Sequence, residues 1–138
     1  RQLRRLSDDL REEAGNVVKA VAIEMQADIV KSLDDGPASG RVYEKYNPRR
    51  THTASAPEQP PMSDTGRLAN SITFDRLGDL TAVVGSNLDY AVHLEYGTAR
   101  MNFAGGVGGP RPFFRPAVER MRPIYIGKLE DIIRRAAR

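Results

Sequence analysis

The sequence predicts an α+β fold in which a long N-terminal helix and a C-terminal helix pack on a small antiparallel β-sheet, with a long Pro-rich extended arm between them. Apolar residues recur at helical spacing near both ends of the chain, and apolar and polar residues alternate in the middle. Prolines gather in between. A length of 138 residues suits one domain, so we expect a single domain over residues 1–138.

Residues 1–35 are predicted to form the long helix. From Val17 onward a second apolar row accompanies the first, which indicates burial on more than one side. Gly15 is expected to mark a bend, and Gly36-Pro37 to end the helix with a left-handed cap. The main row, spaced by three or four residues, is Leu3, Leu6, Leu10, Ala14, Val17, Val21, Met25, Ile29 and Leu33.

Residues 36–62 are predicted to form an extended arm. Five of the nine prolines fall there, among aromatic and basic side chains. Long loops without internal structure are usually functional or disordered, and this one has too few apolar residues to serve the core. We therefore expect it to lie on a partner surface. The residues assigned to this inter-subunit arm are Arg41, Tyr43, Tyr46, Arg49, Arg50, His52, Pro57, Pro60 and Pro61.

Residues 63–98 are expected to begin and end with a short helix. Ser63 or Asp64 would cap the first one. The second is expected from about Asp89 to Tyr96, with Gly97 as its C-terminal cap.

A β-hairpin is predicted between these two helices. Apolar and polar residues alternate over 72–76, and a second strand is expected over 80–84. Leu77-Gly78-Asp79 supplies turn residues between the two strands. The strands should therefore pair antiparallel.

Residues 99–111 are predicted to be a glycine-rich link, followed by the C-terminal helix over 112–138. The link lacks the Lys-Ser/Thr pair and the preceding strand of a phosphate-binding loop, so a flexible connection is the better interpretation. Pro112 or Pro116 suits the first turn of the helix. Pro123 should kink or restart it.

Composition argues against several kinds of chemistry. The chain has no cysteine, which excludes disulfides and thiol chemistry, and His52 and His93 lie too far apart in sequence to suggest a metal site. No stretch approaches the roughly 20 apolar residues of a membrane span. No nucleophile stands beside a base. We expect no enzyme activity, no cofactor and no metal.

The net charge of +3 is distributed unevenly along the chain. Residues 1–35 carry 6 basic and 8 acidic side chains, whereas residues 112–138 carry 7 and 3. This excess alone does not make a nucleic-acid binder, and no recognition module is visible. A non-specific DNA-binding protein stays open as an alternative from a different class.

Three groups of short motifs, in order along residues 36–120, resemble one known family. The first is Gly40-Arg-Val-Tyr43 with His52-Thr-Ala-Ser-Ala-Pro57 and Pro60-Pro61. The second is Thr65-Gly-Arg-Leu68 with Ser71-Ile72 and Val84-Gly-Ser86. The third is Tyr90-Ala91 with Leu94-Glu-Tyr-Gly-Thr98 and Pro112-Phe-Phe-Arg-Pro-Ala117. Together they resemble the tail-completion or neck proteins of tailed bacteriophages, the gene-product-ten family of phage HK97.

The resemblance implies a non-enzymatic structural virion protein. It would be a neck or tail-completion subunit whose ring, six-fold or twelve-fold, joins the tail to the head connector around the DNA channel. A tail terminator or another minor tail protein is the alternative. The implied partners are further copies, head-completion or connector proteins, and tail terminator or tail tube proteins, with non-specific contact to DNA left open. The implied location is the virion, and the host cytoplasm during assembly, with no membrane.

The matching residues near the third motif are expected to build the fold. Glu95 would be partly buried and would need a cation, for which Arg115 and Arg67 are candidates, or backbone donors. Gly97 would take a positive φ. Phe113 and Phe114 would anchor the last helix onto the hairpin. The full set of fold-motif residues is Glu95, Tyr96, Gly97, Thr98, Pro112, Phe113, Phe114 and Arg115.

Overall fold

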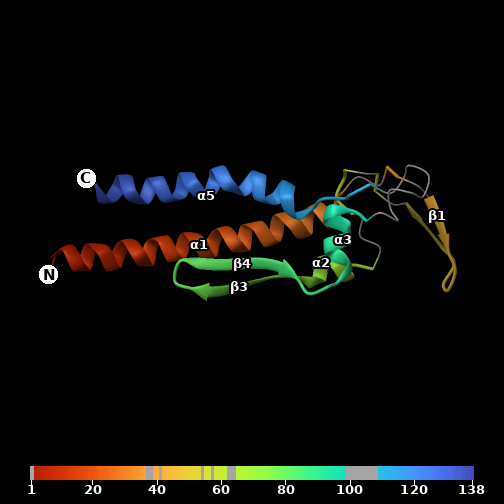
Figure 1. Cartoon of the computed structure of the whole chain (residues 1–138), viewed down its shortest axis with the longest axis horizontal. Helices are drawn as coiled ribbons and strands as arrows, with labels where there is room; N and C mark the ends of the chain where they lie inside the picture. The colour runs from red at the N-terminus through yellow and green to blue at the C-terminus, as the bar shows by residue number, and fades with distance from the viewer. Residues whose placement is uncertain are drawn as a thin grey trace.

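Helix α1 (Gln2–Asp34) is the element on which most of the remaining elements pack. The computed structural model describes residues 2–36, 39–40, 42–53, 55–56, 58–61, 65–98 and 109–138. In Figure 1, α1 runs along a flat, elongated body, with α5 (Phe114–Ala136) on one side and a β-hairpin on the other. Two helices and a small antiparallel sheet confirm the predicted α+β class.

The buried face of α1 begins in the middle of the helix. Its buried residues are spaced so that they lie on one side, and Gly15 is the first of them. Leu3 and Leu6, in the first two turns, are exposed. The helix continues through Gly15, where a Cβ would lie 2.7 Å from the carbonyl oxygen of Asp79. This glycine therefore permits a close approach of the hairpin turn.

The predicted left-handed cap at Gly36 is wrong. Gly36 does not have a positive φ, and the Asp35 N–H donates to the Lys31 carbonyl at 2.8 Å, which continues the helical pattern. A Cβ on Gly36 would lie 2.6 Å from the carbonyl oxygen of Ser32. Glycine is needed here because the backbone leaves the helix so close to this carbonyl oxygen. Pro37 lies outside the described residues.

The region predicted as an extended arm contains its own hairpin. Strands β1 (Val42–Lys45) and β2 (Arg50–Thr53) pair antiparallel, with Val42 opposite Thr53. The turn between them contains a cis peptide bond at Asn47-Pro48. Strands of four residues with few apolar side chains give almost no alternation signal, which is why the sequence pattern missed them.

The predicted central hairpin is present, with a different turn. Strands β3 (Ile72–Gly78) and β4 (Thr81–Ser86) pair antiparallel, and Asp79-Leu80 connects them where Leu77-Gly78-Asp79 was expected. Phe74 pairs with Val84, and both side chains are half-buried. The register is irregular between Arg76 and Gly78. Pairing nevertheless continues to Gly78 and Thr81, beyond the end of the first strand that the pattern predicted.

The two short helices flank this hairpin. Helix α2 (Arg67–Ser71) begins after Gly66, which has a φ of 72°, whereas Ser63 or Asp64 was expected as its cap. Those two residues lie outside the described residues. Helix α3 (Tyr90–Tyr96) has the predicted C-terminal cap at Gly97.

Helix α5 runs antiparallel to α1 along most of its length (Figure 1). Pro123 lies inside this helix, which continues past it. The prediction named a kink or a restart at Pro123, and the restart is wrong. Because Pro123 is on the exposed side, water can reach the carbonyl group that loses its donor. Three ion pairs cross the seam: Asp28–Arg120 at 2.6 Å, Glu24–Lys128 at 2.7 Å and Glu13–Arg135 at 3.2 Å.

The main apolar core lies at the end of the body where all the helices meet. It combines residues of α1, α2, β3, α3 and α5, so the fold is fixed at this end. Its buried members are Ile29, Leu33, Ala69, Ile72, Ala91, Phe113 and Ala117.

Replacement of Gly15 by alanine should destabilise the protein. Alanine in a helix gains up to ~1 kcal/mol over glycine, but overpacking against the Asp79 carbonyl costs ~1–3 kcal/mol. We expect Gly15→Ala to lower the free energy of unfolding by about 1 kcal/mol in urea denaturation followed by circular dichroism.

Gly127→Ala in α5 is the matched control, because a Cβ there meets no atom within 4 Å. It should raise the free energy of unfolding by ~0.5–1 kcal/mol. If both variants were stabilised, the tight contact at Gly15 would be contradicted.

Candidate functional site

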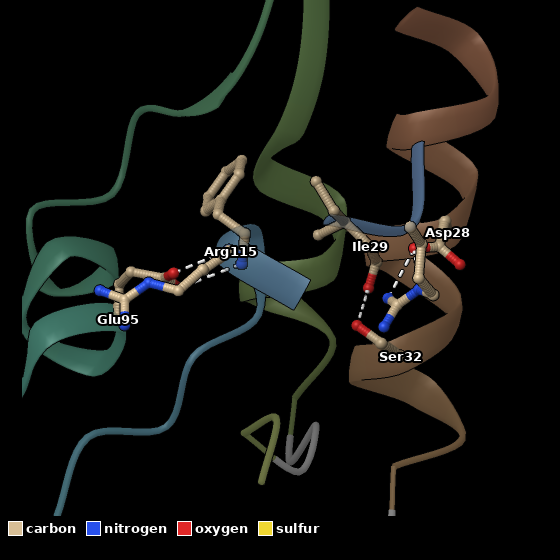
Figure 2. A network of polar contacts seen from close by, with 7 residues as sticks. Asp28, Ile29, Ser32, Glu95 and Arg115 are labelled. Atoms are coloured by element: carbon tan, nitrogen blue, oxygen red, sulfur yellow. Dashed lines mark hydrogen bonds and ion pairs between the residues drawn. The ribbon is translucent and has the colours of Figure 1, made fainter. Parts of the chain in front are cut away.

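The carboxylate of Glu95 joins α3 to the start of α5. Glu95 is buried, with 6% of its surface exposed. Its Oε2 accepts the backbone N–H groups of Phe113 at 2.8 Å and Phe114 at 3.0 Å, and its Oε1 accepts that of Arg115 at 2.8 Å. Figure 2 shows this side chain reaching from α3 to the first turn of the neighbouring helix.

This contact accounts for every free donor at the start of α5. A helix leaves its first four N–H groups without partners inside the helix. Phe113 is the cap residue, and its N–H and the next two bind Glu95. The fourth position is Pro116, which has no N–H. A negative charge is also favourable at this positive end of the helix dipole. Glu95 is thus a complete cap supplied from another helix.

The partners of Glu95 are backbone groups. The sequence named Arg115, Arg67 or backbone donors, and Arg115 contributes through its main-chain N–H. The Arg67 side chain is exposed on α2. The sequence did contain a signal for this cap. Pro116, at the third helical position, has no N–H, so three adjacent N–H groups remain at the helix start for one carboxylate to accept.

The other fold-motif residues lie around this cap. Gly97 has a φ of 74°, and a Cβ on it would lie 3.3 Å from the Pro110 nitrogen. The Arg111 N–H donates to the Leu94 carbonyl at 2.7 Å, so the chain before α5 lies against the end of α3. Thr98 and Pro112 are half-buried, and Tyr96 is exposed.

The two phenylalanines differ in burial. Phe113 is completely buried in the main core with Ile72 of the hairpin. Phe114 is half-buried and packs against that core, with its ring centroid 4.8 Å from that of Phe113. Both therefore hold the start of α5 against the body.

Residues of the predicted arm fall into two groups. Those on the β1–β2 hairpin are Tyr43 and His52, which are opposite each other, and Tyr46, Arg49 and Arg50. Arg41 and Pro57 lie outside the described residues. The turn is held by Glu44, a residue that sequence reasoning missed: it accepts the Tyr46 hydroxyl at 2.8 Å and pairs with Arg49 at 3.7 Å.

The second group forms the base of the arm. Pro60 is half-buried and Pro61 is buried. The Glu58 N–H donates to the Pro110 carbonyl at 2.8 Å, which ties the base to the segment before α5. The Gln59 Oε1 accepts the Ser39 hydroxyl at 2.7 Å and the Ala56 N–H at 3.1 Å. Gln59, also missed from sequence, thus holds the two ends of the arm together.

The surface beside the cap is hollowed and mainly apolar. An open hollow of about 480 Å³ lies next to Glu95, lined mainly by apolar side chains such as Leu88, Val92 and Phe114. Among the described residues, no three His, Asp or Glu side chains lie close enough to hold a metal ion. Glu95 itself is fully engaged with backbone donors, so its chemistry is structural.

Removal of the Glu95 carboxylate should destabilise the protein more than the loss of any surface charge. An unsatisfied buried donor costs ~1–3 kcal/mol. We expect Glu95→Ala to lower the free energy of unfolding by about 3 kcal/mol, and Glu95→Gln by about 2 kcal/mol, because the amide keeps only one acceptor. Urea denaturation measures both.

Glu119→Gln, on the exposed side of α5, is the matched control and should change stability by less than ~0.5 kcal/mol. Equal effects of Glu95→Gln and Glu119→Gln would contradict the capping role.

Comparison with known proteins identifies the family. Residues 1–97 match the HK97-gp10-like family model, described as "Bacteriophage HK97-gp10, putative tail-component". The match includes all of α1 and ends at Gly97, before α5. No curated protein and no solved structure matches the chain. In the part of the chain that the structure describes, no helix is both long and apolar enough to span a membrane. The chain therefore belongs to the HK97-gp10-like family and is a structural tail component of a bacteriophage.

Proposed function

We propose that this chain is a neck or tail-completion subunit. Copies of it form a ring that joins the tail to the head connector around the DNA channel. The ring contacts head-completion or connector proteins on one side and tail terminator or tail tube proteins on the other. Membership of a family of tail components supports a structural role, and two features of the surface support assembly with neighbours.

The projecting β1–β2 hairpin is the observation that carries the proposal. Its strands pair with each other and make no extensive contact with any other helix or strand described. Figure 1 places it at the end of the molecule opposite the two chain termini. An isolated two-stranded hairpin is marginally stable in water. A neighbouring subunit would supply the packing that the chain's own body does not.

The hairpin also presents side chains suited to contact. Tyr46 is 71% exposed at the turn, and Val42 is exposed at the start of β1. The pair between Glu44 and Arg49 lies in solvent, where such pairs contribute little. These residues are not needed for the core, so their presence is explained better by recognition of a partner.

The body supports the same conclusion. Among the described residues, exposed large apolar side chains outnumber buried ones. Single exposed apolar residues are ordinary, but rows of them on several elements are typical of surfaces that other subunits cover.

The basic C-terminal helix does not favour the DNA-binding alternative. Its cations are largely paired within the chain: Arg120, Lys128 and Arg135 with acidic residues of α1, and Arg134 with Asp131. Paired cations release fewer counterions from DNA. The alternative of a tail terminator or another minor tail protein differs from our proposal in the layer of the particle that the ring occupies.

Deletion of the hairpin should block joining without unfolding the body. Val42 lies opposite Thr53, so a short glycine-serine linker can replace residues 42–53 while the base at 55–61 stays. We expect the purified variant to unfold at the urea concentration of the wild type. Phage carrying this variant should accumulate separate heads and tails in electron micrographs and lose infectivity.

The unfolding midpoint is the control that separates misfolding from failed assembly. A phage with the folded, hairpin-deleted protein and a wild-type titre would contradict the proposed function.

A further inference from the structure

Helix α5 carries two parallel rows of side chains, and only one row faces the body. Within each row the residues are three or four positions apart, so each row lies on one side of the helix. The inner row, buried or half-buried, is Phe114, Ala117, Met121, Tyr125, Lys128 and Ile132. The outer row, of which only Leu129 is half-buried, is Arg115, Val118, Arg122, Ile126, Leu129 and Ile133.

The outer row has the composition of a buried face. Val118, Ile126 and Ile133 are 39%, 47% and 67% exposed. β-Branched residues are poorer helix formers than the charged residues common on solvent-facing helices. Three of them in one row, beside Leu129, therefore indicate a surface that another subunit covers.

The arginines of the outer row differ from the other cations of α5. Among the described residues, neither Arg115 nor Arg122 forms an ion pair, whereas Arg120, Lys128 and Arg135 of the same helix each pair with α1. The row thus presents apolar side chains together with two unneutralised cations.

The opposite edge of the body carries a complementary surface. On the exposed side of the β3–β4 hairpin, Asp75 lies opposite Val83. Val83, Leu77 and Leu80 are all exposed. Among the described residues, the Asp75 carboxylate accepts the N–H of the next residue. This side of the hairpin therefore presents apolar side chains around one carboxylate.

The two surfaces lie along the same stretch of α1. β3 begins where Gln26 binds the Ile72 carbonyl at 2.8 Å, and the hairpin turn lies at Gly15. The second half of α5 pairs with Glu24 and Glu13 of α1. The apolar residues of both surfaces therefore lie at the same level along the axis of α1. Figure 1 places α5 and β3 on opposite long sides, with α1 between them.

From this arrangement we infer that neighbouring copies in the proposed ring pack side by side, with the outer row of α5 of one copy on the exposed side of the β3–β4 hairpin of the next. Apolar residues meet apolar residues, and the arginines of the outer row meet the Asp75 carboxylate. Such a contact uses two different surfaces, so each copy keeps one of each kind for its other neighbour. Contacts of this type form a ring when the rotation between successive copies closes. The inference rests on the proposed function for the ring itself.

Cysteine cross-linking in purified phage particles tests this contact, because the chain has no cysteine of its own. The first variant combines Leu77→Cys with Ile133→Cys, and the second combines Val83→Cys with Ile126→Cys. A disulfide needs Cβ atoms roughly 3.5–4.5 Å apart, so only adjacent surfaces react. After oxidation we expect at least one of the two variants to give a ladder of multimers on a non-reducing gel.

The controls separate this contact from other arrangements. Each single-cysteine variant should stay monomeric, because the two surfaces differ. Leu3→Cys with Ile133→Cys, which moves one thiol to the free end of α1, should form no ladder.

A ladder in neither double variant, or dimers from a single-cysteine variant, would overturn the inferred contact while leaving the ring intact. Infectious particles that contain no copy of this chain would instead overturn the proposed function.

Discussion

The carboxylate of Glu95 determines where helix α5 starts, and the layout of the body follows from that point. It binds three successive N–H groups, and Pro116 removes the fourth free donor. With its start fixed against α3, α5 extends antiparallel along α1. Asp28, Glu24 and Glu13 of α1 form ion pairs with basic side chains of α5 across the seam. The inner row of α5 then faces α1 and the outer row faces away. The buried carboxylate of Glu95 thus determines which side chains of α5 are exposed to other subunits.

The body built in this way is flat and elongated (Figure 1). Helix α1 separates α5 from the β3–β4 hairpin, and the main core is confined to the end where α2 and α3 join them. Domains usually bury their apolar faces between two packed layers. Here the main core is confined to one end and apolar residues elsewhere on the body stay exposed, which suits a subunit whose neighbours complete its burial. The projecting β1–β2 hairpin, at the far end of the molecule, also depends on neighbours for packing.

Sequence reasoning succeeded where the signal is local and failed where contacts between distant segments decide. The rows of α1 and the alternation after Ile72 predicted the long helix and the central hairpin. Gly15 was assigned a bend, but it is required by the close approach of Asp79, a residue far away in sequence. The donors of Glu95 lie 18–20 residues away, so their identity depended on the fold. The short polar strands of the arm left no pattern to find.

The central claim is that neighbouring subunits cover what this chain leaves exposed, and a cryo-electron microscopy reconstruction of the intact phage tests it most directly. We expect a closed ring of this chain at the junction of head and tail. The β1–β2 hairpin and the outer row of α5 of every copy should be buried against adjacent protein. Copies that stand apart from one another, with both surfaces facing solvent, would contradict the account.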